Sequence, residues 1–137
     1  MTVLLGINDI GDISRVLTGP PGLAPQPVSA EEIVAGHLQM IARAHQQGLK
    51  ALGCTLTPFE GAAYFSPEGE SKREAVNKFI RTGGAYDGVI DFDAAVRDPG
   101  HPARFLPMYD SGDHLHPNDA GYKAMADAID LSLFKRR

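Results

Sequence analysis

Three short apolar segments alternate along the chain with three stretches of helical periodicity, and this alternation constrains the fold more than any other feature. The apolar segments are residues 2–6, 49–57 and 89–93. The stretches that follow them repeat apolar residues every three or four positions, which is typical of amphipathic helices. Strands that alternate with helices form parallel sheets with right-handed crossovers. The sequence therefore predicts an α/β fold.

Capping residues mark where the predicted helices begin. The first helix starts at a capping box, in which Ser29 is followed three residues later by Glu32. The second is predicted over residues 68–81, and the last over residues 118–133. Residues 94–112 carry little regular signal, so we expect a loop there.

Composition and charge narrow the class of protein. With 137 residues, the chain has the size of one domain, and we expect residues 1–137 to share a single core. A net charge of −4 gives no basic surface for nucleic acid. The single cysteine, Cys54, excludes a disulfide within the chain, and its apolar neighbours predict a buried thiol rather than a nucleophile. The chain contains no apolar stretch that suits a leader or a membrane span, and its localisation stays unknown.

Asp113 lies three residues before His116 in a loop that opens the last predicted helix. A catalytic histidine needs a carboxylate on Nδ1 to fix its tautomer, which leaves Nε2 free to take a proton from a nucleophile. Asp113 and His116 suit these two roles. The alternative is a helix cap or a surface loop, in which such tetrapeptides also occur.

Asn8 follows the first predicted strand, within the segment Gly6-Ile7-Asn8-Asp9. A side-chain amide that points at a developing oxyanion stabilises the transition state by about 2.7–4 kcal/mol. The alternative for Asn8 is an ordinary Asn/Asp turn. Ligands of parallel sheets bind at the carboxyl ends of the strands, so we expect Asn8 to lie at the binding edge.

These two motifs, in this order and on this pattern of strands and helices, resemble the SGNH/GDSL hydrolase family. The family's G-x-N-D block is matched by Gly6, Asn8 and Asp9, and its D-x-x-H block by Asp113 and His116. The resemblance implies a three-layer, flavodoxin-like α/β fold and hydrolysis of small carboxylic esters, as in esterases and lipases. It also implies His116 as general base, Asp113 as its orienting acid and Asn8 as an oxyanion donor. We expect no cofactor.

The chain departs from the family at the nucleophile. Family members take it from a Gly-Asp-Ser block on an earlier strand, and this chain has no such block. It thus resembles strands three to five of the family sheet, truncated to about three strands. Another nucleophile is then needed: Ser66 or Ser14, less well Ser29 or Ser111, a residue from a partner chain, or water activated by His116. The alternative is an inactive fragment or one that needs a complementing part.

Metal-assisted hydrolysis through Asp113, His114 and His116 is a second alternative. Zinc sites use three or four protein ligands, and the remaining histidines are scattered along the chain. We therefore assign no metal site. His37 and His45 fall on the first predicted helix, where we expect partly exposed surface positions.

The first predicted strand also indicates self-association. Val3, Leu4 and Leu5 would form an apolar strand at the sheet edge, and unpaired backbone groups on such an edge pair with other chains. We expect a homodimer or a larger homo-oligomer.

Overall fold

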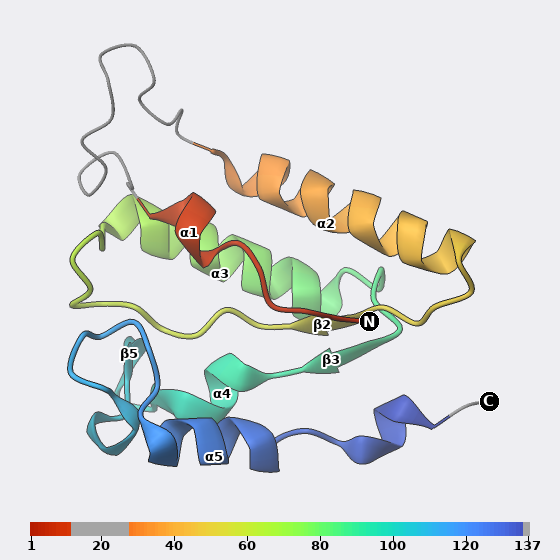
Figure 1. The fold of residues 1–137 in the computed structure, drawn as a ribbon. Helices are drawn as coiled ribbons and strands as arrows, with labels where there is room; N and C mark the ends of the chain where they lie inside the picture. The colour runs from red at the N-terminus through yellow and green to blue at the C-terminus, as the bar shows by residue number, and fades with distance from the viewer. Residues whose placement is uncertain (12–27, 136–137) are drawn as a thin grey trace, which may run out of the picture.

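A three-stranded parallel sheet forms the centre of the molecule (Figure 1). The computed structural model describes residues 1–11 and 28–135. The strands β1 (Thr2–Val3), β2 (Leu52–Cys54) and β3 (Gly88–Ile90) lie in the order β1-β2-β3. The predicted α/β fold with a parallel sheet is confirmed, although each strand is shorter than its apolar segment.

Helices cover both faces of the sheet, which gives the expected three layers. Helices α2 (Ala30–Gln46) and α3 (Pro67–Thr82) lie on one side, and α4 (Phe92–Val96) and α5 (Asp119–Asp127) lie on the other (Figure 1). Each side has its own buried apolar cluster. The residues of the first cluster are Ile10, Ile33, Leu56, Phe59, Ala62, Val76 and Ile80. Those of the second are Cys54, Ile90, Phe92, Val96, Phe105 and Met125.

The helix starts follow the predicted capping chemistry. Glu32 N donates to Ser29 Oγ across 3.2 Å, and Ser29 N donates to Glu32 Oε2 across 2.8 Å, so the capping box is formed. Helix α3 starts one residue earlier than predicted, because Ser66 Oγ accepts a hydrogen bond from Gly69 N at 3.0 Å.

The segment predicted to be a loop, residues 94–112, contains regular structure. It holds most of α4, the antiparallel pair β4 (Arg97–Asp98) and β5 (His101–Phe105), and the 3-10 helix η2 (Pro107–Tyr109). The β4–β5 turn is closed by Gly100 N, which donates to Asp98 Oδ1 at 2.8 Å. The prediction of a loop was therefore wrong, because these elements are too short to show periodicity.

The last helix is shorter than predicted. Helix α5 ends at Asp127, and a separate 3-10 helix, η3 (Leu131–Phe134), follows it. Asp130 starts η3, because its carboxylate accepts a hydrogen bond from Ser132 N at 2.8 Å. Aspartate competes for backbone N–H groups in this way, which favours a new start over continuation of the helix.

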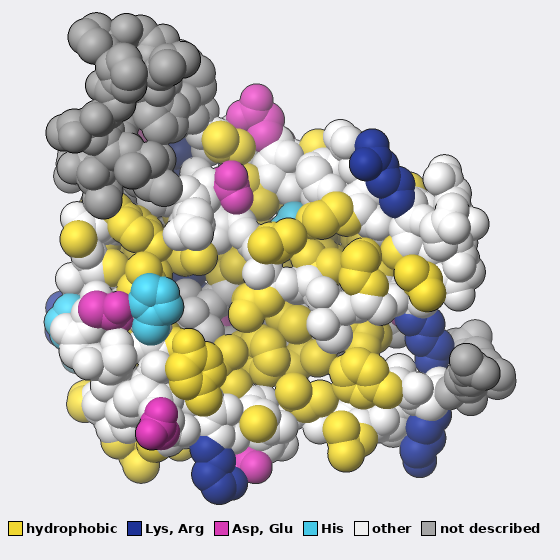
Figure 2. Space-filling model, viewed as in Figure 1, with side chains coloured by type: hydrophobic (Ala, Val, Ile, Leu, Met, Phe, Trp, Pro, Cys, Tyr) yellow, Lys and Arg dark blue, Asp and Glu magenta, His cyan; other side chains and the backbone are white. Residues whose placement is uncertain are grey.

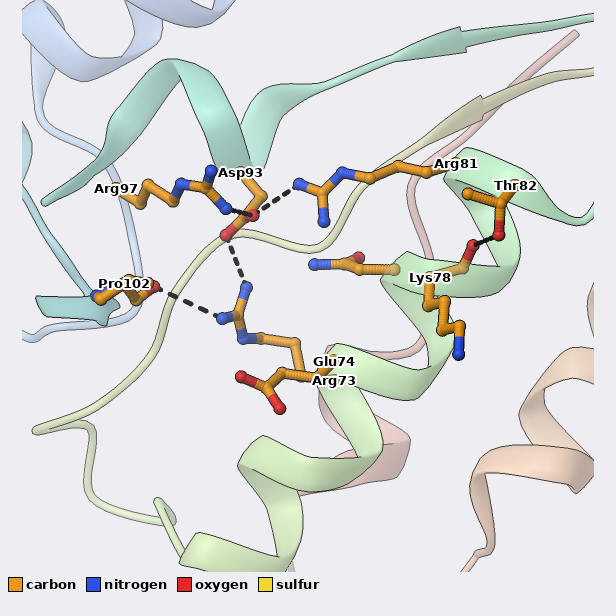
Figure 3. A pocket seen from close by; sticks show the side chains of 9 residues that line it. Arg73, Glu74, Lys78, Arg81, Thr82, Asp93, Arg97 and Pro102 are labelled. Atoms are coloured by element: carbon orange, nitrogen blue, oxygen red, sulfur yellow. Dashed lines mark hydrogen bonds and ion pairs between the residues drawn. The ribbon is translucent and has the colours of Figure 1, made fainter. Parts of the chain in front are cut away.

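Asp93 lies at the centre of an ion-pair network that joins α3 to α4. Its carboxylate is 2% exposed and accepts hydrogen bonds from Arg73 and Arg81, each at 2.6 Å, and from Arg97 at 3.0 Å (Figure 3). These four residues line a pocket of about 260 Å³. None of the predicted catalytic residues lines it, and the three guanidinium groups are already paired with carboxylates. The network is therefore structural.

Cys54 and His37 are also buried in the interior. Cys54 is 2% exposed in β2, as predicted, and burial raises the pKa of its thiol. His37 is also 2% exposed, so the prediction of a partly exposed position was wrong for this histidine. His45, near the end of the same helix, is exposed as expected.

Strand β1 lies at the edge of the sheet and leads into exposed apolar residues. Leu4 is 43% exposed and Leu5 is 55% exposed. Figure 2 shows hydrophobic side chains gathered over the middle of this face of the molecule. None of the helices within residues 1–11 and 28–135 has both the length and the apolar character to cross a membrane.

Candidate active site

The loop before α5 brings His116 and Asp113 together. His116 Nδ1 lies 2.6 Å from Asp113 Oδ2. An ionised carboxylate only accepts hydrogen bonds, so Nδ1 carries the proton and Nε2 has a free lone pair. The imidazole side chain is 61% exposed. The free nitrogen therefore belongs to an accessible ring in the tautomer that a general base requires.

Asp113 is held by several donors besides His116. Its Oδ1 atom accepts the backbone N–H groups of Leu115 at 2.9 Å and His116 at 2.8 Å, and the hydroxyl of Ser111 at 2.9 Å. The hydrogen bonds from the side chain and backbone of His116 hold the pKa of Asp113 well below its usual range. Asp113 is thus a fixed negative charge beside the imidazole.

Asn118 and Leu115 anchor this loop to the rest of the fold. Asn118 Nδ2 donates to the carbonyl oxygens of Met108 and Asp110, each at 3.0 Å, and its Oδ1 accepts from Gly121 N at 3.0 Å as the cap of α5. Leu115 packs against the apolar cluster that contains Ile10. The loop is therefore held at its base by the start of α5 and at its tip by the core.

Asn8 lies in a short helix rather than at the end of an extended strand. The helix α1 (Ile7–Ile10) begins after Gly6, whose φ of 123° is a conformation that L side chains rarely adopt. Tyr64 Oη donates to Asn8 Oδ1 at 3.3 Å. Because the oxygen of the amide is engaged, its Nδ2–H₂ group is left as a donor on an exposed side chain.

Three segments converge at the carboxyl end of the sheet, where Figure 1 shows α1, the loop after β2 and the loop before α5. Ile10 of α1 and Leu115 contact the same apolar cluster. Burial and then the nearby charge of Asp113 raise the pKa of Tyr64. Tyr64, bonded to Asn8, therefore lies within electrostatic reach of the Asp113–His116 pair. Sequence reasoning missed Tyr64, because nothing in its local sequence indicates these partners.

The candidate nucleophiles are placed less favourably. Ser66 and Ser29 cap helices, and Ser111 Oγ donates to Asp113. Ser14 lies outside the described residues. Within residues 1–11 and 28–135, His116 Nε2 has no hydroxyl as a hydrogen-bond partner.

A second histidine–carboxylate pair lies in the same loop. His114 Nδ1 is 2.5 Å from Asp110 Oδ2, and the His114 backbone has a φ of 61°. Its ring packs so closely on Gly61 that a Cβ there would lie 2.8 Å from ring atoms. Burial would raise the pKa of Asp110, but hydrogen bonds from Gly112 and His114 outweigh it and lower that pKa. This pair braces two loops against each other.

The geometry gives little support to the metal alternative. His114 and His116 each bind a different carboxylate through Nδ1. In the part of the chain that the structure describes, no three His, Cys, Asp or Glu side chains are grouped to hold a metal ion.

Known proteins resemble this chain in fold and in sequence profile. A protein assigned as an acylhydrolase from Bacteroides fragilis superposes with a TM-score of 0.67 at 17% identity, over 96% of this chain and 59% of that one. A GDSL-like lipase from Bacteroides thetaiotaomicron gives a TM-score of 0.60 at 18% identity, over 96% of this chain and 60% of that one. The chain thus spans about three fifths of these proteins. Among curated proteins, none matches it. The profile of the GDSL-like lipase/acylhydrolase family matches residues 1–124, which is most of the sequence, and the chain therefore belongs to that family.

Proposed function

We propose that this chain supplies the acid, base and oxyanion parts of a site that hydrolyses small carboxylic esters. The observation that carries the proposal is the free Nε2 of His116, whose Nδ1 is bound to Asp113 at 2.6 Å. His116 removes a proton from the attacking hydroxyl, and Asp113 stabilises the imidazolium that forms. Asn8 Nδ2–H donates to the oxyanion of the tetrahedral intermediate. When the tetrahedral intermediate collapses, the ester C–O bond breaks and the imidazolium gives its proton to the departing alcohol. Water, deprotonated by His116, then attacks the acyl group in a second step, which releases the acid and frees the nucleophile.

We further propose that the nucleophile arrives on a strand that pairs with β1. The edge of β1 is unpaired among the described residues, and Leu4 and Leu5 beside it are exposed. About two fifths of the length of each solved structure of similar fold lies outside the part that matches. A different partner chain paired at this edge would explain both features. The predicted homo-oligomer would cover the edge of β1, but a second copy of this chain brings no Gly-Asp-Ser block. Ser14 is the alternative source, so Ser14→Ala is part of the test.

Hydrolysis of p-nitrophenyl acetate by the purified chain tests the proposal. His116→Ala should lower kcat by about 10³-fold or more, as loss of a triad member does. His45→Ala is the matched control, because His45 is also an exposed histidine paired with a carboxylate, Asp87, at 2.8 Å. Equal rates for the two variants would contradict the proposal. If wild type has no activity, the inactive-fragment alternative holds for the chain alone.

Addition of a strong chelator separates the metal alternative from acyl transfer. We expect no loss of rate, since no step requires a metal ion. A rate abolished by chelator and restored by zinc would favour the metal mechanism.

A further inference from the structure

His37 is a buried residue of α2, and its side chain contacts the segment that leads from β1 into α1. His37 is only 2% exposed, yet both nitrogens of its ring have polar partners. Nε2 lies 3.2 Å from the carbonyl oxygen of Leu5, and Nδ1 lies 2.6 Å from the hydroxyl of Tyr86. The imidazole therefore does more than fill space: its two hydrogen bonds link α2 to Leu5 and to Tyr86.

The partners fix the state of the ring. A carbonyl only accepts hydrogen bonds, so Nε2 carries a proton and donates it to Leu5. Burial lowers the pKa of His37, which favours the neutral ring. Nδ1 of a neutral ring with a protonated Nε2 is an acceptor, so the Tyr86 hydroxyl donates to it. The direction of both hydrogen bonds follows.

Tyr86 and Phe79 hold the imidazole in place. Both aromatic rings meet it edge-on, with interplanar angles of 86° for Tyr86 and 82° for Phe79. Tyr86 in turn packs on β2, where a Cβ at Gly53 would lie 2.5 Å from its ring. The imidazole is thus fixed relative to the sheet.

The carbonyl of Leu5 belongs to the peptide group that leads directly into Gly6 and α1. The N–H groups of Asp9 and Ile10 both donate to the carbonyl of Gly6, at 3.1 and 3.0 Å. Holding the Leu5 carbonyl therefore fixes the start of the helix that carries Asn8. We infer that His37 is a positioning residue for Asn8, acting through the Leu5 carbonyl. One part of this inference rests on the proposed function, namely that Asn8 is an oxyanion donor.

Two substitutions separate the hydrogen bond from the volume of the ring. His37→Leu fills the space without a donor, whereas His37→Gln supplies an amide N–H near the place of Nε2. His45→Leu is the control on the same helix, where the side chain is exposed. Tyr86→Phe keeps the hydrogen bond from His37 to Leu5 and should have a smaller effect than His37→Leu.

Amide hydrogen exchange gives a readout that needs no activity. In His37→Leu, the amides of residues 9–11 should exchange about tenfold faster, the factor that one typical hydrogen bond supplies. His37→Gln should restore wild-type exchange to within about threefold. Unchanged exchange at residues 9–11 would overturn the inference. Equal acceleration throughout α2 and α3 would also overturn it, because it would show general destabilisation.

A double-mutant cycle in the ester assay tests whether Asn8 is the residue that His37 serves. His37→Leu should lower kcat about tenfold with little change in KM, and His37→Gln should recover most of that loss. In an Asn8→Ala background, His37→Leu should have less than about a twofold effect. Additive losses would contradict action through Asn8. If wild type does not hydrolyse the ester, the inactive-fragment alternative holds for the chain alone, while the exchange experiment still decides the role of His37.

Discussion

Tyr64 Oη donates a hydrogen bond to Asn8 Oδ1 across 3.3 Å and so joins the loop after β2 to helix α1. The bond settles which end of the amide faces Tyr64. Without it, the oxygen and nitrogen of Asn8 are free to exchange places, and the donor would point toward an oxyanion for only part of the time.

Tyr64→Phe should therefore lower kcat for ester hydrolysis by up to about tenfold, because the lost hydrogen bond costs up to about 1.5 kcal/mol of orientation. KM should change little, since the oxyanion forms only in the transition state. Steady-state kinetics measure both parameters. Tyr122→Phe, on the exposed surface of α5, is the control. A larger change in KM than in kcat would assign Tyr64 to substrate binding instead.

Asp113 should act as a permanent negative charge in the ester assay. The pKa of Asp113 is lowered by its hydrogen bonds, so this carboxylate stays charged well below pH 5. Asp113→Asn should lower kcat by about 10⁴-fold, because the imidazole of His116 loses the carboxylate that fixes its tautomer. Steady-state kinetics at neutral pH measure the change. A loss below about tenfold would argue against a histidine base that Asp113 orients.

The lowered pKa of Asp113 also makes the stability of the folded state depend on pH. Asp113 favours the folded state when it is ionised, so its contribution is present above its ordinary pKa of about 3.9. That contribution is lost as the pH falls through the lower value of the folded state. Acid unfolding of wild type, compared with Asp113→Asn, should show this loss only at the acid end.

Removal of the Asp93 charge should destabilise the fold strongly. Asp93→Asn leaves Arg73, 3% exposed, without its full partner, and breaking one side of a buried ion pair typically costs about 3–5 kcal/mol. Urea unfolding measures the change. Lys123→Ala is the control, because the Lys123–Asp127 pair is exposed and should contribute less than about 0.5 kcal/mol. A loss for Asp93→Asn as small as the control would mean that Glu70 and Asp91, the other carboxylate partners of Arg73 and Arg81, compensate for the lost charge.

We expect self-association through the edge of β1, which has no partner strand among the described residues. Light scattering after size-exclusion chromatography should give more than one chain per particle at micromolar concentration. Leu4→Lys should shift the particles toward single chains, since a lysine at a strand edge opposes pairing. Met108→Lys, at an exposed position in η2, is the control. Single chains for wild type would argue against the homo-oligomer.

Local signals account for what could be predicted from the sequence. The capping box at Ser29 acts between neighbours in the chain, so the start of α2 was predicted correctly. The same holds for the start of α5 at Asn118 and for the contact of His116 with Asp113, which are three residues apart. The family resemblance is also confirmed, because the model of the GDSL-like lipase/acylhydrolase family matches residues 1–124.

Tertiary contacts account for what could not be predicted. Tyr64 reaches Asn8 across 56 positions, and His37 reaches Leu5 across 32, and no local pattern encodes either pair. His37 shares its helix with His45, and periodicity alone did not separate the buried one from the exposed one. The pair β4 and β5 was missed because strands this short show no alternation, although Pro99-Gly100 was a usable turn signal.

The reactivity of the single thiol, Cys54, can report how often the sheet opens. Because it is buried in the middle strand and its pKa is raised by burial, it should react with thiol reagents only when the sheet opens. The labelling rate of a single unmodified side chain then measures how often the two helical layers separate from the sheet. No engineered probe is required, and the destabilised variants can be ranked by the same chemistry.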